Sequence, residues 1–325
     1  MKVAVQMDPL EKINLEEDTT ICLIKEALSQ GFECWYYTAD KLYLTCGQVL
    51  ALASKLSIKN GKILFRSAEK INLASTDVVL MRQNPPMDMD YLTSTYILEK
   101  IHPKTFVINN PTEVRNLPEK LFICNYPDFM PPTLVAKDWK IAEEFFTEHK
   151  DIVIKPLYAF GGQDVSRITL GEISSAEFKQ FFKDVSARHA SPVMLQKFLP
   201  EVEMGDKRVL LVNGEIAGVI NRIPAQGDIR ANMCIGGKPT KTILTARDLE
   251  MCRILGVELK KRGIILAGLD IIGRYVTEIN ITSPTGIKAI NELYDLVGRD
   301  RVEYKFWESV TRIATTKDIF VEMRY

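Results

Sequence analysis

The stretch LAGLDIIGRYVTEINITSPTG, residues 266–286, sets three oxygen-bearing side chains into an otherwise apolar and β-branched run. Residues 264–272 have the composition of a buried strand, residues 273–275 that of a short turn, and residues 276–281 that of the returning strand. We therefore predict a β-hairpin that carries a polar site on one face of a sheet.

A three-residue turn would fix the pairing of this hairpin. Ile272 would pair with Val276, which puts Asp270 opposite Glu278 on the same face. Asn280 shares that face, because side chains two residues apart in a strand point the same way. Two carboxylates and an amide oxygen suit Mg²⁺, which completes its shell with water and substrate phosphates.

The alternative for this acidic trio is a solvated surface without a ligand. Carboxylates that lie close together among Ile, Leu and Val repel each other unless a cation sits between them. We therefore predict that Asp270, Glu278 and Asn280 hold a metal ion and that its partner is a nucleoside triphosphate.

The composition excludes several classes of partner. The chain has 325 residues, of which 46% are hydrophobic, so its length favours two or three domains. Its 42 basic and 42 acidic residues cancel, which gives no field of one sign to attract nucleic acid or an anionic membrane. We expect small-molecule partners.

The cysteine pattern favours a cytoplasmic protein. The six cysteines form no CxxC pair and are spread through apolar segments, which is typical of reduced core thiols. The N-terminal apolar run is too short for a signal peptide, and we find no uncharged segment long enough to span a bilayer.

The first third of the chain alternates strand and helix patterns. Such alternation predicts a parallel sheet with helices on both faces, and ligands of such sheets bind beyond the carboxyl ends of the strands. Asp8 and Arg82 follow two of the predicted strands directly. The predicted strands and helices lie at residues 2–7, 16–30, 32–38, 77–82, 91–100 and 105–108.

A second unit follows from about residue 118. It contains a predicted helix at residues 138–149 and a strand that ends at Lys155, and Gly161-Gly162 then form a turn into another strand. Strand, turn, strand differs from the strand, turn, helix of a P-loop, and the chain has neither GxGxxG nor GxxxxGKS/T. A glycine turn between strands can still lie over phosphates above a lysine, although a plain hairpin turn is the commoner outcome.

The last third predicts an antiparallel hairpin, a lid and a helix. Asn213-Gly214 suits a type I′ turn, and Arg208 and Arg222 at the two strand ends would point into one cleft. Residues 224–238 have no periodicity, so we predict a lid that carries Arg230, with a plain surface loop as the alternative. Thr245 should cap a helix over residues 246–262, with an apolar stripe made of Leu249, Cys252, Leu255 and Leu259.

These motifs together resemble the prokaryotic glutathione synthetases of the ATP-grasp superfamily. The matching pieces occur in the family's order from near residue 1 to about residue 290. They are Met7-Asp8-Pro9, Met81-Arg82 with Pro85-Pro86, Glu119-Lys120-Leu121-Phe122, Ile154-Lys155-Pro156, residues 205–209, Arg222-Ile223-Pro224, residues 268–273 and residues 277–285.

The resemblance implies an α/β ATP-grasp fold with three parts. These are an N-terminal parallel-sheet domain (1–118), a small lid subdomain (119–200) and a large subdomain with the metal site (201–325). The implied activity joins γ-glutamylcysteine and glycine through an acyl phosphate, giving glutathione, ADP and phosphate. ATP and Mg²⁺, with Mn²⁺ as the alternative ion, are the implied cofactors. A homo-oligomer, in the family a tetramer, is the implied assembly.

The resemblance also implies a role for individual residues. Arg208, Arg222 and Arg230 are the implied catalytic residues, and Asp270, Glu278 and Asn280 the metal ligands. The substrate-binding set is Arg82, Arg222, Asn280, Ser283 and Thr285. The nucleotide-binding set is Lys120, Lys155, Gly161, Gly162, Gln196, Lys197, Phe198, Leu199, Asp206 and Arg208.

Two departures from the family pattern bear on the nucleotide. Tyr158, Ala159 and Phe160 stand where the family's loop has a further glycine and a methionine, which predicts a different loop conformation over the phosphates. Lys197-Phe198 replaces an Asn-Tyr pair beside adenine. The remaining alternatives are another ATP-grasp carboxylate–amine ligase and a nucleotide-binding protein without catalysis.

Overall fold

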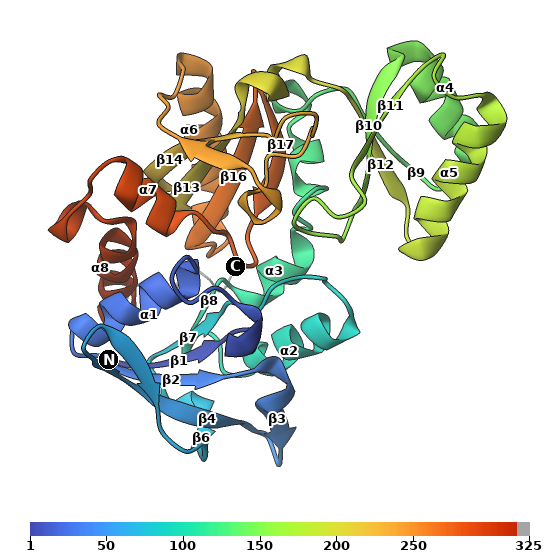
Figure 1. Cartoon of the computed structure of the whole chain (residues 1–325). Helices are drawn as coiled ribbons and strands as arrows, with labels where there is room; N and C mark the ends of the chain where they lie inside the picture. The colour runs from blue at the N-terminus through green and yellow to red at the C-terminus, as the bar shows by residue number, and fades with distance from the viewer. Residues whose placement is uncertain (317–325) are drawn as a thin grey trace.

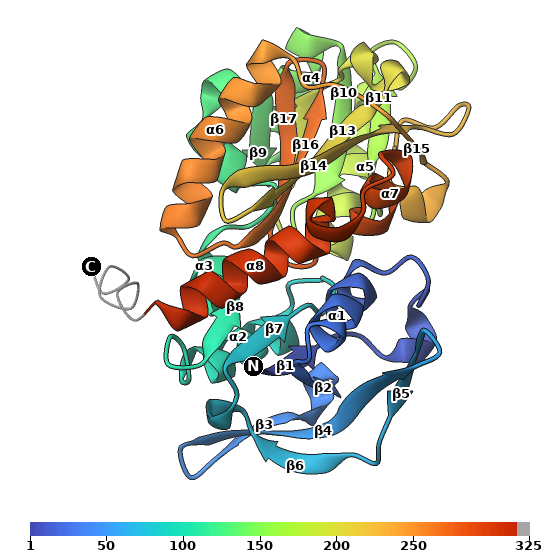
Figure 2. The ribbon, with the colours of Figure 1, turned by 90° about the vertical axis from the view of Figure 1, so that its left-hand side faces the viewer.

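The computed structural model of the chain describes residues 1–316, and it contains three separate β-sheets (Figure 1). The first sheet is formed by the N-terminal third of the chain. The second and third sheets lie beside each other on the other side of the molecule (Figures 1 and 2).

The first sheet has a parallel centre, as the alternating pattern predicts. Its order is β3-β4-β2-β1-β7-β8, and β5 and β6 also pair with β4. The parallel strands are β1 (Lys2–Gln6), β2 (Glu33–Tyr37), β7 (Val78–Met81) and β8 (Phe106–Ile108). Its helices are α1 (Thr19–Ser29), α2 (Met89–Glu99) and α3 (Pro111–Asn116).

The sheet continues as an antiparallel extension that the sequence analysis left unassigned. It is built on the twelve-residue strand β4, which pairs with three shorter strands and with β2. The members are β3 (Leu42–Thr45), β4 (Gln48–Lys59), β5 (Lys62–Phe65) and β6 (Glu69–Asn72).

The second sheet is antiparallel and has the order β11-β10-β12-β9. Two amphipathic helices pack on it around an aromatic core that includes Phe146, Phe178 and Phe182. The elements are β9 (Thr133–Ala136), α4 (Trp139–His149), β10 (Asp151–Pro156), β11 (Ser166–Thr169), α5 (Ser175–Arg188) and β12 (Val193–Lys197).

The third sheet carries the hairpin from which the sequence analysis began. It is antiparallel, with the order β15-β14-β13-β16-β17. Its strands are β13 (Asp206–Val212), β14 (Glu215–Ile223), β15 (Lys238–Thr240), β16 (Leu266–Ile272) and β17 (Tyr275–Asn280). Its helices are α6 (Ala246–Lys261), α7 (Ile287–Leu293) and α8 (Val302–Thr315).

The predicted turn between β16 and β17 is wrong by one residue, yet the predicted facing pair is right. Ile272 pairs with Tyr275, because Gly273, with φ of 58°, permits a shorter turn. A β-bulge at Thr277 then adds one residue to β17, and Asp270 faces Glu278 after all.

One residue of the predicted apolar stripe on α6 is also misplaced. Leu249 is 49% exposed, whereas Met251 is fully buried. Cys252, Leu255 and Leu259 are buried as predicted. The buried face of α6 therefore begins with Asp248 of the capping box and Met251 rather than with Leu249.

Helix α8 joins the two ends of the chain. It packs against α1 of the N-terminal unit and against β13 and β14 of the third sheet (Figure 2). Trp307 is fully buried at this junction, and its Nε1 donates a hydrogen bond to the carbonyl oxygen of Leu23, 2.7 Å away. Residues 118 and 200 fall in the connections between sheets. Three separate domains remain a prediction, and residues 317–325 of the third lie outside the described part.

In residues 1–316 no helix has the length and apolar character needed to cross a membrane.

Candidate active site

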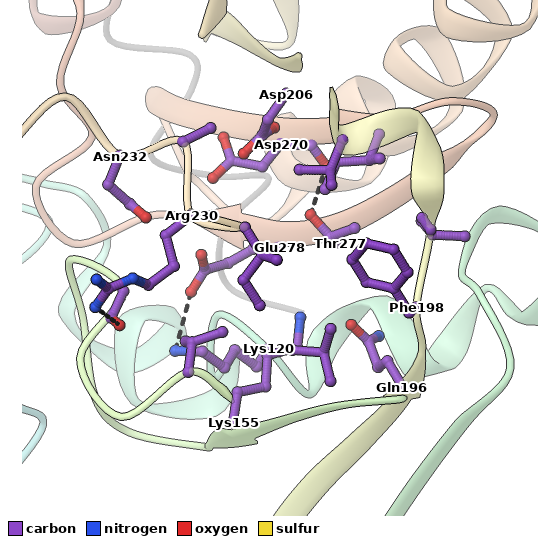
Figure 3. Close-up of a pocket in the computed structure, with 18 of the residues that line it drawn as sticks. Lys120, Lys155, Gln196, Phe198, Asp206, Arg230, Asn232, Asp270, Thr277 and Glu278 are labelled. Carbon is purple, nitrogen blue, oxygen red and sulfur yellow. Dashed lines mark hydrogen bonds and ion pairs between the residues drawn. The ribbon is translucent and has the colours of Figure 1, made fainter. Parts of the chain in front are cut away.

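A cleft between the second and third sheets gathers most of the predicted nucleotide and metal residues. In Figure 3, Gln196 and Phe198 lie at one end of the cleft and Arg230 and Asn232 at the other, with the carboxylates between them. The predicted site residues that line it are Lys120, Lys155, Gly161, Gly162, Gln196, Lys197, Phe198, Leu199, Asp206, Arg230, Asp270 and Glu278.

Two lysines lie on the cleft floor. The side chain of Lys120 is 7% exposed, and its Nζ lies 3.1 Å from Oε1 of Glu278. It also donates a hydrogen bond to the carbonyl oxygen of Ala159 in the glycine turn. Burial lowers the pKa of Lys155 to about 8, although Glu278 nearby opposes this shift. Both ammonium groups therefore face a space that suits anionic oxygens.

The glycine turn connects β10 to β11 and touches the predicted lid. Gly161 and Gly162 have φ of 62° and 79°, a region that side chains disfavour. Arg230 of residues 224–238 points Nη1 at the carbonyl oxygen of Gly162, 3.4 Å away. Tyr158 and Phe160, which replace family residues here, are each 41% exposed, and Phe160 is one of the residues that line the cleft. The lid thus lies closed over the turn.

Asp270 is the most strongly held carboxylate of the site. Arg208 binds it in a bidentate pair, with Nε 2.5 Å from Oδ1 and Nη2 2.9 Å from Oδ2. Arg222 adds a contact of 3.1 Å to Oδ2. Burial would raise the pKa of Asp270, but the two guanidinium groups outweigh it and lower the pKa to about 2. Arg208 and Arg222 thus meet at Asp270, but neither of them is among the residues that line the cleft.

Asp206 lies beside Asp270, but in Asp206 the effect of burial on the pKa outweighs that of the neighbouring arginine. Burial raises its pKa to about 7, against the opposing pull of Arg222, whose Nη2 lies 2.5 Å from Oδ2. Its Oδ1 is buried without a hydrogen-bond partner. An acceptor of this kind in a cleft wall suits a hydroxyl donor of a ligand.

The donor set on β16 and β17 fits Mg²⁺ only in part. Asn280 donates from Nδ2 to Oδ2 of Asp270, 3.2 Å away, and Asp270 faces Glu278 across the strand pair. In this structure Arg208, Arg222 and Lys120 supply the cations between the carboxylates, so a metal is not required to relieve their repulsion. Within residues 1–316 no cluster of three or more His, Cys, Asp or Glu side chains is placed to hold a metal. The Asn280 amide, water and phosphates would have to complete the shell.

Arg222 and Asn280 of the predicted substrate set contact Asp270, whereas Arg82, Ser283 and Thr285 lie outside this cleft, at the contact between the first and third sheets. Arg82 is buried and donates to the carbonyl oxygen of Pro284 at 2.9 Å and to Oγ1 of Thr20 at 3.2 Å. Ser283 donates to Oδ1 of Asn84 at 2.6 Å. The carbonyl oxygen of Thr285 accepts a hydrogen bond from Nη1 of Arg208. Arg208 therefore connects these substrate residues to Asp270 in the cleft.

Three residues that were given no role from the sequence contact residues of the site. Asp228 holds Arg230 through its guanidinium and its backbone N–H, at distances from 2.8 to 3.3 Å. Glu119 binds the segment that follows β17, and Arg167 stacks its guanidinium 3.8 Å from the ring centre of Phe198. Only Glu119 had a sequence signal, its position directly before Lys120.

Two family models match the chain over most of its length. The model of the prokaryotic glutathione synthetase N-terminal domain matches residues 1–115, and that of the prokaryotic glutathione synthetase ATP-grasp domain matches residues 119–295. This chain belongs to the prokaryotic glutathione synthetase family. The predicted family and the predicted class of ATP-dependent ligase are thereby confirmed.

Named relatives agree with this assignment. The chain is 42% identical over 313 residues to a glutathione synthetase of Rhodopseudomonas palustris, covering 95% of this chain and 98% of that protein. It is 37% identical over 299 residues to a glutathione synthetase of Yersinia pestis, covering 90% and 93%.

Solved structures confirm the ATP-grasp fold. The D-cycloserine synthetase DcsG superposes with a TM-score of 0.68 at 13% identity, covering 97% of this chain and 100% of that one. An ATP-grasp RimK domain protein of Sphaerobacter thermophilus superposes with a TM-score of 0.61 at 15% identity, covering 96% and 100%. At 13% and 15% identity, these two structures show that the chain shares their fold, and they say nothing about its substrates.

Proposed function

We propose that this chain joins γ-glutamylcysteine to glycine at the expense of ATP, giving glutathione, ADP and phosphate. The observation that carries the proposal is the family match over residues 1–115 and 119–295, together with a cleft in which Lys120 and Lys155 face the carboxylates of Asp270 and Glu278. The carboxylate of γ-glutamylcysteine attacks the γ-phosphate, and the glycine amine then attacks the acyl phosphate.

The nucleotide would lie along the cleft. Lys120 and Lys155 neutralise its phosphates from the floor, and Gly161-Gly162 cover them with backbone N–H groups. The strand end at residues 196–199 borders the adenine, and the free Oδ1 of Asp206 accepts a hydrogen bond from the ribose. Arg230 and the lid keep water from the acyl phosphate.

Asp270, Glu278 and Asn280 would hold Mg²⁺, which when bound offsets the negative charge of the phosphate oxygens. Members of the family use ATP and a divalent cation, and the oxygen donor set favours Mg²⁺ over softer ions. Comparing turnover in metal-stripped buffer with Mg²⁺ or Mn²⁺ added back tests this choice. Equal activity without any added metal would remove the metal role from the trio.

Arg208 and Arg222 are placed to stabilise the transferring phosphoryl group, because both guanidinium groups meet at Asp270. Arg82, Asn280, Ser283 and Thr285 are proposed to bind the γ-glutamylcysteine. Support comes from their position, since the Arg208 side chain reaches from Asp270 to the backbone of Thr285.

The proposal is tested by coupled ADP release with purified protein, Mg-ATP, γ-glutamylcysteine and glycine, with glutathione quantified by mass. Stimulation by D-alanine or glutamate instead would assign the chain to another carboxylate–amine ligase. Binding of Mg-ATP in a calorimeter without turnover for any pair would favour a nucleotide-binding protein. A homotetramer, to be measured by light scattering, and a cytoplasmic location remain predictions.

A further inference from the structure

Glu119 lies outside every role assigned above, yet it contacts the segment that carries the metal and substrate residues. One of its carboxylate oxygens, Oε1, accepts three hydrogen bonds. The donors are the backbone N–H of Ile281 at 2.8 Å, the backbone N–H of Thr282 at 3.0 Å and the Thr282 hydroxyl at 2.8 Å. The carbonyl oxygen of Glu119 accepts a fourth, from the N–H of Ile279 at 3.0 Å.

These contacts close an open sheet edge. β17 is the last strand of the third sheet, so its outward N–H groups have no neighbouring strand to bond. Glu119 belongs to the connection between the first and second sheets and reaches this edge from outside. It therefore satisfies backbone donors that the sheet itself leaves without partners.

The bonded donors alternate with the proposed functional residues. Ile279 lies between Glu278 and Asn280, and Thr282 directly precedes Ser283. The next residue after Glu119 is Lys120, which pairs with Glu278 at 3.1 Å. The segment Glu119-Lys120 thus fixes both the position of the proposed metal ligands and the start of the substrate loop, residues 281–285.

We infer that Glu119 is a positioning residue, which holds the edge of β17 and the substrate loop so that γ-glutamylcysteine meets the transferring phosphoryl group. This role rests on the proposed function for its substrate. Glu119 performs this role through Oε1, which accepts the three hydrogen bonds. An amide oxygen at the same place would serve as well, whereas a methyl group would release three donors.

The test uses the full-length protein and four variants. Glu119→Ala removes the acceptor and Glu119→Gln keeps it, and Thr282→Val removes only the hydroxyl donor. Glu26→Ala is the matched control, because Glu26 is a buried carboxylate that accepts bonds from Arg301 and Gln30 far from the cleft. The steady-state constants for ATP and for γ-glutamylcysteine, the melting temperature and backbone hydrogen exchange are measured for each.

For Glu119→Ala we expect the KM for γ-glutamylcysteine to rise at least about tenfold while the KM for ATP stays within about threefold. Glu119→Gln should stay within about threefold of the wild type in both. Thr282→Val should raise the KM for γ-glutamylcysteine by less than Glu119→Ala does. Glu26→Ala should lower the melting temperature and leave both KM values in place.

An unchanged KM in Glu119→Ala, or a Glu119→Gln as impaired as the alanine variant, would overturn the inference. If Glu119→Ala does not fold, Thr282→Val decides, and an unchanged KM for γ-glutamylcysteine would then count against it. Hydrogen exchange over residues 276–285 separates this test from the proposed function, since it needs no turnover. Faster exchange there in the alanine variant than in Glu26→Ala supports the role even if the wild type makes no glutathione, and equal exchange refutes it.

Discussion

Gly162 is expected to control how well the lid closes, and its replacement by alanine tests this. A Cβ at Gly162 would lie 2.9 Å from Oδ1 of Asn232, 3.2 Å from Cδ of Arg230 and 3.3 Å from Cδ1 of Ile235. All three atoms belong to the lid, so the lid must shift outward. Overpacking of this kind costs roughly 1–3 kcal/mol, which weakens lid closure by about 5- to 150-fold.

The variant Gly171→Ala is a matched control. Gly171 also has a positive φ, of 94°, but a Cβ there meets nothing within 4 Å. Both variants therefore pay about 1–2 kcal/mol for alanine in a left-handed conformation, and both should lose stability to a similar degree. Only Gly162→Ala should disturb the lid.

The assay measures kcat/KM for ATP and the ratio of ADP released to glutathione formed. Gly162→Ala should lower kcat/KM at least about fivefold and raise the ADP ratio above one, because water reaches the acyl phosphate. Gly171→Ala should change kcat/KM by less than about twofold. Equal kinetic losses in both variants, or none in Gly162→Ala, would refute the assignment of these contacts to lid closure.

Three further changes have distinct expected outcomes. Glu278→Gln should lower turnover at least about 100-fold. The melting temperature should change little, because the carboxylate faces the cleft and not the core. Retained activity would show that the trio is not the metal site. The pKa of Lys155 is about 8, so kcat/KM for ATP should fall above that pH as the ammonium loses its proton. Lys155→Arg should abolish this fall, because arginine keeps its charge. A flat wild-type profile up to about pH 10 would contradict the prediction. Trp307→Phe should cost about 2–3 kcal/mol in urea unfolding, since it removes the indole donor to the carbonyl of Leu23 and leaves a gap in the junction, while kcat per folded molecule stays constant. An altered kcat at unchanged stability would speak against a purely structural role.

Local patterns were sufficient for the elements near the cleft. The Asn213-Gly214 turn, the Thr245 cap and the strand, glycine turn, strand order around Gly161-Gly162 depend on residues close in sequence, and all appear in the structure. The facing of Asp270 and Glu278 was also predictable, although for a partly wrong reason. The bulge at Thr277 restored a pairing that the shorter turn would otherwise have shifted.

Contacts between distant segments could not be predicted in the same way. The pairing of Lys120 with Glu278 joins residues 158 positions apart, and the hydrogen bonds of Glu119 to Ile281 and Thr282 span a similar distance. No periodicity records such contacts, because they depend on how three sheets pack. The same holds for Trp307, whose hydrogen bond to Leu23 spans 284 positions.

The sequence by itself determined the family, most of the elements around the cleft and the residue types of the site. The reason is that hydrophobic period, turn residues and strand-end polar groups act over a few neighbours. Tertiary structure decided which cation neutralises each carboxylate, where the lid rests and what closes the edge of β17. Those outcomes depend on burial and on partners brought from afar, since buried charges and open backbone donors must be satisfied by whatever the fold places beside them.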